Sequence, residues 1–492
     1  MKFKVYDMDL TTGGPLVVAL RKQDAKHLDA YSGDRLVIKH GHKEVVCILD
    51  IAESKKGVPE GHIGMFEEVL AHLGLRHGAE VEVKYSGKPE SVSHIRDKLF
   101  GKKLNYEELY HIIDDITNDR LTQIEKTYFV SAYFAHGFTF DETVNLTKAM
   151  VNTGNKLKFS KLTLDKHCIG GVPGNRTTMV VIPIIAAAGF TIPKTSSRAI
   201  TSPAGTADTM ECLARVELPY HKIMQVVKKT HACIVHGGSM NLAPADDKII
   251  EVERPLSVDA EGQLLASVLA KKYSVSANLV LIDIPMGKST KAKNMKDATH
   301  LKVMFEKVGK ALGMKVKVIV TDGSHPIGYG IGPLFEADDV MNVLSNDPRA
   351  PPELKKKALF MAGQLLEMTG KYKKGEGQKV AKEILESGKA YEKMNQIIES
   401  QGRQKKIFPG KYTYAVSATR SGKINEVDND VIAKIARISG NPEDKGAGII
   451  LSKNVGDKVS KGDLLYTVYA HGQTKIDLVK EFIHSGDGYR IK

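Results

Sequence analysis

The first 86 residues contain several short segments in which apolar and polar positions alternate. Alternation with a period of two is typical of strands that bury one face. Helical spacing occurs once in this stretch, in GMFEEVLAHLGL. Several short strands with one helix predict a small barrel-like domain over residues 1–86. The segments expected to form its strands are FKVYDMDL, PLVVAL, DRLVIKHG, EVVCILDIA and AEVEVKYSG.

The pattern changes to a helical period in residues 87–157. Apolar residues recur three and four positions apart in NYEELYHIIDDI, TQIEKTYFVSAYFAHG and TFDETVNLTKAMV. Thr139 and Asp141 are suitable residues for the start of the last of these helices. We therefore expect a helical domain, to which residues 246–275 return.

Short apolar runs then alternate with helical segments in residues 158–245 and 276–405. VLIDIP and VKVIVTD are separated by the amphipathic segment THLKVMFEKVGKALGM. This order predicts a strand–helix–strand unit, a parallel sheet and a right-handed crossover. Residues 406–492 return to strand-like patterns and predict a C-terminal α+β domain. The expected fold class is thus multidomain, with α/β and α+β parts.

A glycine-rich stretch, KHCIGGVPGNRTT (residues 166–178), follows the strand-like segment KLTLD and precedes a long apolar run. Glycines between a strand and a helix can present backbone N–H groups and the positive helix end to an anion. The same glycines could serve only as a tight connection. The spacing is neither that of a P-loop nor that of a dinucleotide-binding fingerprint.

A second stretch, PKTSSRAITSPAGTADTMECL (residues 193–213), places hydroxyl side chains around Arg198 before another helix. Two such loops, both opening helices, favour an anion site over two ordinary connections. In a third stretch, residues 236–272, Ser257 and Asp259 precede an amphipathic helix. An aspartate in that position is commonly a helix cap and nothing more.

Charge and composition narrow the class of ligand. The chain of 492 residues has a formal net charge of +13. Because the basic residues are spread along the chain without a basic tail, an anionic small substrate is a better interpretation than nucleic acid. There is no apolar run long enough to span a bilayer, and MKFKVYDMDL lacks the apolar core of a signal peptide, so we expect a cytoplasmic protein without membrane partners. The four cysteines show no CxxC spacing, and we expect no metal site.

The pair KHCIGGVPG and SSRAITSPAGTADTMECL resembles the motifs of the thymidine and pyrimidine-nucleoside phosphorylase family. RPLSVDAEGQLLAS and the barrel-like N-terminal part are most similar to the archaeal AMP phosphorylases within that family. The resemblance extends over essentially the whole chain. It implies a nucleoside phosphorylase class II-like fold, with a double-psi-like N-terminal barrel, and a homodimer or larger homo-oligomer. It also implies phosphorolysis of AMP to adenine and ribose 1,5-bisphosphate, with CMP and UMP as further substrates.

The same resemblance implies roles for individual residues. Asp259 would be the acid that protonates the departing base. Inorganic phosphate, a co-substrate in a reaction without a cofactor, would bind at Lys166, Thr177, Ser196 and Thr206. The residues that would bind the nucleotide are Gly171, Ser197, Arg198, Ala199, Ile200, Thr201, Ser202, Thr206, Ser267 and Lys291. The chain departs from the family at Cys168, where many members have a serine that donates to phosphate, and at Pro203 and Met210.

Three other functions remain as alternatives. A thymidine or pyrimidine-nucleoside phosphorylase should use a cationic side chain to hold a pyrimidine carbonyl. An anthranilate phosphoribosyltransferase should need Mg²⁺ and an acidic motif for diphosphate. A basic nucleic-acid-binding protein should bind polynucleotide with a steep salt dependence.

Overall fold

The computed structural model describes residues 1–159, 161–199, 202–256 and 260–492. The chain forms two compact units. The first comprises Met1–Thr153 and Ala243–Ser267, and the second comprises Gly154–Leu242 and Val268–Lys492. Within the ranges that the structure describes, no helix is long and apolar enough to cross a membrane.

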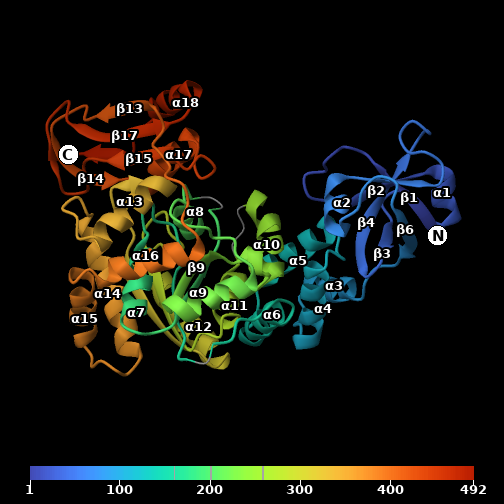
Figure 1. Ribbon diagram of the computed structural model, residues 1–492, viewed down its shortest axis with the longest axis horizontal. Coiled ribbons are helices and arrows are strands. Elements are labelled where there is room, and N and C mark those ends of the chain that lie inside the picture. Colours follow the sequence, from blue (N-terminus) through green and yellow to red (C-terminus); the bar gives the residue numbers. More distant parts are fainter. Residues whose placement is uncertain (160, 200–201, 257–259) are drawn as a thin grey trace. The chain divides into compact units, whose positions relative to one another are not determined.

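The N-terminal part of the first unit is a closed six-stranded barrel, which confirms the predicted barrel (Figure 1). Most strands match the alternating segments, because one face of each is buried in the barrel interior. Strand β5 and helix α1 (Lys22–His27) were not expected, since four and six residues are too few to show a period. The strands, in barrel order, are β1 (Lys2–Asp7), β5 (His62–Met65), β2 (Val17–Arg21), β4 (Lys43–Ala52), β3 (Arg35–His40) and β6 (Glu80–Ser86); α2 is Glu67–Leu73.

Helices make up the rest of the first unit. Thr139 caps α6 as expected, since its side chain accepts from the Glu142 backbone while the Glu142 carboxylate accepts from the Thr139 backbone. The Glu142 carboxylate also binds the buried Lys98 ammonium at 2.7 Å. The helices are α3 (Ser91–Leu99), α4 (Tyr106–Thr117), α5 (Gln123–His136), α6 (Phe140–Asn152), α10 (Pro244–Glu253) and the first part of α11 (Glu261–Tyr273).

Parallel strands form the centre of the second unit. β7 (Leu164–Cys168), β10 (Leu279–Met286) and β11 (Lys315–Asp322) form one sheet in the order β11-β10-β7, with every pair parallel. A parallel bridge between Thr163 and Thr191 places β8 (Ile192–Ser196) beside β7, and β8 pairs with β9 (Ala232–His236). The carboxyl ends of β7, β8 and β10 therefore lie at one edge, where ligands of open α/β sheets usually bind.

Helices surround these strands, and the apolar α7 is buried among them. Its side chains pack against α14 and α16, which explains why its sequence is a continuous apolar run without a polar face. The helices are α7 (Thr177–Ala187), α8 (Thr206–Glu211), α9 (Tyr220–Thr230), α12 (Met295–Ala311), α13 (Pro333–Leu344), α14 (Pro352–Met368), α15 (Glu376–Glu386) and α16 (Lys389–Gln401).

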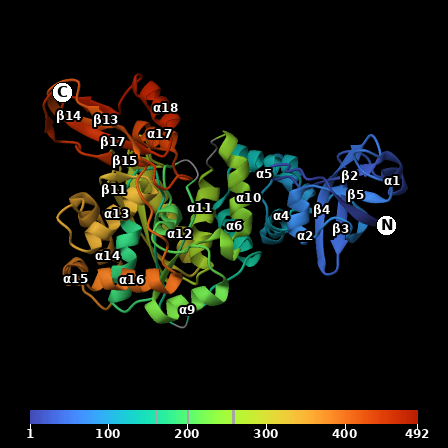
Figure 2. The same ribbon diagram turned by 45° about the horizontal axis from the view of Figure 1, so that its top comes forward.

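The C-terminal module has the predicted α+β composition and is joined to the rest of the second unit through a shared sheet. Strand β12 (Gly330–Ile331) pairs with β15 (Gly448–Leu451) in the order β12-β15-β17-β13. Helices α17 (Asn429–Ser439) and α18 (Gln473–Ile483) lie side by side in both views (Figures 1 and 2). The remaining strands are β13 (Tyr412–Ser417), β14 (Gly422–Val427), β16 (Lys458–Val459), β17 (Leu464–Ala470) and β18 (Tyr489–Ile491).

Candidate active site

Three loops meet at the carboxyl ends of β7, β8 and β10. Their described residues are 169–176, 197–199 with 202–205, and 287–294, and together with α17 these segments line a cavity of about 1030 Å³. All these segments belong to the second unit. The two stretches singled out in the sequence, KHCIGGVPGNRTT and PKTSSRAITSPAGT, therefore lie at one cavity.

The glycine loop depends on glycine at a specific position. Gly170 and Gly171 both have φ of +93°, a backbone region that other residues enter only with strain. A Cβ on Gly171 would lie 2.9 Å from Thr290 Cα and 3.0 Å from Ser289 O. Gly171 therefore lets the glycine loop pack directly on the loop after β10.

Lys166 lies in β7 and not in the turn after it, because the strand covers residues 164–168 where the sequence pattern predicted 161–165. Its side chain is fully buried, and Nζ donates to Thr177 Oγ1 at 2.8 Å and to Thr178 Oγ1 at 3.1 Å. Burial lowers the pKa of the Lys166 ammonium. The strand and the first turn of α7 thus hold a buried cation beside hydroxyl groups.

Asn175 connects this cation to Cys168. Its Oδ1 accepts from Thr177 Oγ1 at 3.0 Å, and its Nδ2 donates to Cys168 Sγ at 3.3 Å. Burial raises the pKa of the Cys168 thiol, so the group is a neutral thiol at neutral pH. Cys168 is thus a poor nucleophile and a weak hydrogen-bond donor.

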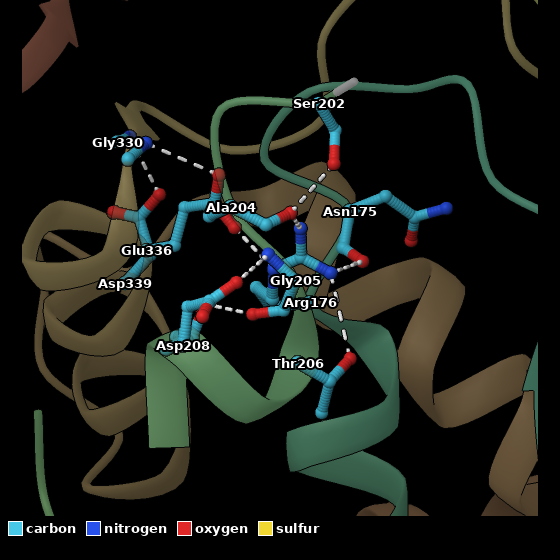
Figure 3. Close-up of polar contacts among 12 residues, drawn as sticks. Asn175, Arg176, Ser202, Ala204, Gly205, Thr206, Asp208, Gly330, Glu336 and Asp339 are labelled. Carbon is cyan, nitrogen blue, oxygen red and sulfur yellow. Dashed lines mark hydrogen bonds and ion pairs between the residues drawn. The ribbon is translucent and has the colours of Figure 1, made fainter. Parts of the chain in front are cut away.

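Arg176 joins the glycine loop to the Ser/Thr loop (Figure 3). Its guanidinium forms an ion pair with the fully buried Glu336 and donates to Ala204 O at 2.6 Å. A longer contact of 3.5 Å reaches Thr206 Oγ1. Burial raises the pKa of Glu336, although the Arg176 charge opposes that rise. The Arg176 side chain therefore fixes the backbone next to Thr206.

Asp208 holds the Ser/Thr loop from the other side (Figure 3). One carboxylate oxygen accepts from the backbone N–H groups of Ala199 at 2.7 Å and Gly205 at 2.9 Å. Arg198 donates to both oxygens of Glu211, at 2.8 and 3.0 Å, and this pairing lowers the pKa of Glu211 to about 2. The Arg198 charge is thus balanced within the protein, and its side chain serves to shape the loop.

Buried charges lie beneath the cavity. Asp165 is completely buried and faces Lys272 Nζ at 3.0 Å and Lys194 Nζ at 3.6 Å. Burial lowers the pKa of Lys194 well below its ordinary range. Burial and the surrounding lysines also lower the pKa of His167, which lines the cavity as a neutral imidazole at neutral pH.

The structure brings most of the predicted site residues together. Lys166 and Thr177 lie behind the glycine loop, and eight others line the cavity: Gly171, Ser196, Ser197, Arg198, Ala199, Ser202, Thr206 and Lys291. Ser267 belongs to the first unit, where its hydroxyl donates to Asp246 Oδ2 at 2.8 Å. Ile200, Thr201 and Asp259 lie outside the described residues.

Sequence reasoning missed several residues at this cavity. Asn175 and Arg176 stand inside the first motif, and Lys194 stands inside the second, but none was assigned a role. Lys434 and Arg437 of α17 also line the cavity. No motif marks these two, because their position depends on how the C-terminal module packs.

Comparison with protein families defines the class of this chain. Residues 92–154 match the glycosyl transferase family helical bundle domain, and residues 160–275 match the glycosyl transferase family a/b domain. Residues 424–486 match the pyrimidine nucleoside phosphorylase C-terminal domain. The chain is therefore a pentosyltransferase enzyme with three recognisable parts.

Individual relatives identify the family. The chain is 43% identical over 478 residues to a protein named AMP phosphorylase from Methanococcus maripaludis strain C5, covering 96% of this chain and 94% of that protein. It is 44% identical over 443 residues to a protein named "Putative thymidine phosphorylase" from Legionella pneumophila strain Paris, covering 90% and 86%. The chain belongs to the thymidine/pyrimidine-nucleoside phosphorylase family, and its activity is that of a nucleoside phosphorylase.

A solved structure shows the same fold. Anthranilate phosphoribosyltransferase from Thermus thermophilus has a TM-score of 0.52 at 18% identity and covers 63% of this chain and 99% of its own. The likeness concerns fold alone, as identity is low.

Proposed function

We propose that this enzyme phosphorolyses nucleoside 5′-monophosphates, with AMP as substrate and CMP and UMP as further substrates. The observation that supports this most is the set of charges around the cavity. Among its described lining residues, eight are Lys or Arg and one, Asp430, is acidic. A site that holds inorganic phosphate and a nucleotide phosphate at once needs such an excess of positive charge.

The proposed reaction exchanges one bond at C1′ for another. A phosphate oxygen forms a bond to C1′ as the C1′–N bond to the base breaks, and the electron pair of that bond passes to the base nitrogen. Asp259 would donate a proton to the base, which leaves as neutral adenine, and the sugar leaves as ribose 1,5-bisphosphate. Because C1′ gains positive charge as the bond breaks, a phosphate anion positioned beside it lowers the barrier.

Each part of the cavity has a task in this scheme. Lys166, Thr177, Ser196 and Thr206 would bind the attacking phosphate, while Gly171, the loop at 197–202 and Lys291 would bind the nucleotide. Ser267, which belongs to the first unit and does not line this cavity, is a further nucleotide-binding residue implied by the family. Because the Cys168 thiol is a weak hydrogen-bond donor, the buried Lys166 ammonium would be the stronger donor to phosphate on strand β7. His167, held neutral, could donate or accept a hydrogen bond without adding charge.

The test is release of free base. The purified protein is incubated with AMP, adenosine or thymidine, each with and without phosphate, and free base is measured by chromatography. We expect adenine from AMP only when phosphate is present. Equal or better turnover of adenosine or thymidine would contradict the proposal and favour the nucleoside phosphorylase named among the relatives.

Asp259 is tested in the same assay. Asp259→Asn should lower the rate with AMP by about 10²–10⁴-fold, the range for loss of a positioned acid. Ser257→Ala, two residues before it, is the matched control and should keep most of the rate. An Asp259→Asn variant as fast as the unaltered enzyme would refute its role as the acid.

A further inference from the structure

One buried lysine of the cavity has no role in the reaction described above. Lys194 of β8 lines the cavity, although only 3% of its surface is exposed. It forms an ion pair with Asp165, whose Oδ1 lies 3.6 Å from the Lys194 Nζ. That distance is too long for a hydrogen bond of ordinary strength. The Lys194 ammonium therefore keeps N–H groups that can turn toward a ligand in the cavity.

The carboxylate of Asp165 has a second and nearer partner. Lys272 Nζ of α11 lies 3.0 Å from the Asp165 Oδ2, and both residues are fully buried. A single negative charge thus serves two ammonium groups. Because Lys272 is the closer of the two and does not line the cavity, Lys194 is the lysine of this pair that a ligand can reach.

The neighbouring buried groups do not supply the missing negative charge. Lys166 donates to hydroxyls at the start of α7, and no carboxylate of a described residue forms an ion pair with it. Asp283 of β10 is paired with Lys357 Nζ of α14 at 3.2 Å. Burying more ammonium groups than carboxylates is costly, and an anion bound beside them offsets part of that cost.

The position of Lys194 on its strand indicates which anion it meets. Lys194 and Ser196 stand two positions apart on β8, so their side chains leave the strand on the same face. Both residues line the cavity. Ser196 is one of the residues proposed above to bind the attacking phosphate. A phosphate bound at Ser196 therefore has Lys194 as its neighbour on the same strand.

We infer that Lys194 is a further phosphate-binding residue of this enzyme, positioned by the carboxylate that it shares with Lys272. The ligand is inorganic phosphate as the dianion, and the Lys194 ammonium donates a charge-assisted hydrogen bond to it. The inference deepens the proposed function and rests on it for the place of phosphate beside Ser196.

Entry of a dianion should also change the protonation of Lys194. Burial lowers the pKa of Lys194 well below its ordinary range, although the charge of Asp165 opposes that change. A negative charge close to a lysine favours its ammonium form, so anion binding should be coupled to uptake of a proton. Helix α7 contributes no titratable group near Lys194. The other elements around it contribute Asp165, Lys166 and His167 on β7, Cys233 and His236 on β9, and Lys272 on α11.

The first test measures binding of two ligands separately by isothermal titration calorimetry, with inorganic phosphate alone and with AMP alone. Lys194→Met should raise the dissociation constant of phosphate about 10- to 150-fold, as expected for loss of a hydrogen bond from a charged group. The dissociation constant of AMP should change less than about twofold, because AMP alone leaves the place of the attacking phosphate empty.

Two further variants separate this role from a loss of charge or of structure. Lys228→Met removes an exposed lysine of α9 that does not line the cavity, and both constants should stay at wild-type values. Lys194→Gln keeps a hydrogen-bonding side chain without the charge and should weaken phosphate binding as Lys194→Met does. Both Lys194 variants leave Asp165 paired with Lys272, so chemical denaturation without ligand should show folded proteins.

The second test uses sulfate, which remains a dianion near neutral pH and therefore neither takes up nor releases protons itself. Calorimetric titration with sulfate in two buffers of different ionisation enthalpy gives the number of protons that the protein takes up. Wild type should take up protons, and Lys194→Gln should take up fewer. A purely structural role of Lys194 would leave this number unchanged.

The outcomes distinguish the inference from the function on which it rests. Wild-type affinity for phosphate in both Lys194 variants overturns the inference, as does an equal loss of affinity for phosphate and AMP. Absence of phosphate binding by wild type, or of proton uptake when wild type binds sulfate, overturns it without any variant. If wild type releases no adenine from AMP with phosphate present, the proposed function fails. The binding tests need no turnover, so the two failures are separate.

Discussion

The buried Lys166 allows a prediction in which stability and ligand binding respond differently to one substitution. Lys166→Met keeps most of the side-chain volume and removes the ammonium. Burying a charge is costly, so replacing the buried ammonium by an apolar group of similar volume removes a desolvation penalty. The hydroxyls of Thr177 and Thr178 lose a donor, which costs about 0.5–1.5 kcal/mol each. Thr177 still donates to Asn175, so the free enzyme should be about as stable as wild type.

The same substitution should weaken binding of phosphate. Losing one charge-assisted hydrogen bond costs about 1.5–3 kcal/mol, or about 10- to 150-fold in the dissociation constant. At a phosphate concentration about 100 times the wild-type constant, phosphate stabilises wild type by ~2.7 kcal/mol, and the variant by only ~0.3–1.3 kcal/mol. Chemical denaturation with and without phosphate measures the difference, and chloride at equal ionic strength is the control.

The lowered pKa of Lys166 also predicts how the unfolding free energy changes with pH. Burial places the pKa of Lys166 below 10.5 in the folded protein, so the unfolded chain binds the extra proton above that lowered pKa. The unfolding free energy of wild type relative to Lys166→Met should therefore rise as the pH approaches ~10.5. A variant whose phosphate stabilisation equals that of wild type would refute the reasoning, as would a large loss of stability without phosphate.

Two further predictions concern the loops around the cavity. Gly171→Ala should abolish most activity and destabilise more than Gly170→Ala, since both have φ of +93° but only the first brings a Cβ within 2.9 Å of Thr290 Cα. Thermal unfolding and AMP turnover are measured for both variants. Gly170→Ala should lower the unfolding free energy by about 1–2 kcal/mol from backbone strain alone. Equal losses of stability and activity in the two variants would count against the packing contact of Gly171. Burial raises the pKa of Asp339 to about 7, so the folded protein binds a proton that the unfolded chain releases. The unfolding free energy of wild type should therefore fall as pH rises from ~4 through ~7. Denaturation midpoints measured across this pH range should not show that fall for Asp339→Asn. The same pH dependence in the variant as in wild type would exclude Asp339 as its source.

Much of the fold could be predicted from local patterns. The barrel strands other than β5 and the helices at 106–152 follow from their periods, and the strand–helix–strand unit around α12 follows from its order. Strand β7 was placed three residues too early, because KLTLD alternates while DKHC, which forms the strand, is polar in sequence. Asp165 and Lys166 are buried in the strand although they are charged, while His167 and Cys168 line the cavity at its end.

The site was predictable only where it is local in sequence. Lys166 and Thr177 are close because one strand leads to one helix. The pairing of Asp165 with Lys194 and Lys272 requires β8 to lie beside β7, which no local pattern specifies. Lys434 and Arg437 are more than 130 residues beyond Lys291 in the chain, and only tertiary packing brings them to the cavity.

The pairing of β12 with β15 has a consequence for synthesis of the chain. Gly330 pairs with Ile450, so β12 can pair only after about 120 further residues have been translated. Translation of that segment takes on the order of 10 s at ~5–20 residues per second. Helix α17, with Lys434 and Arg437, lies within that interval. During that interval the glycine loop and Lys166 have been translated but α17 has not emerged, so the cavity gains its last lining segment only when the C-terminal module folds.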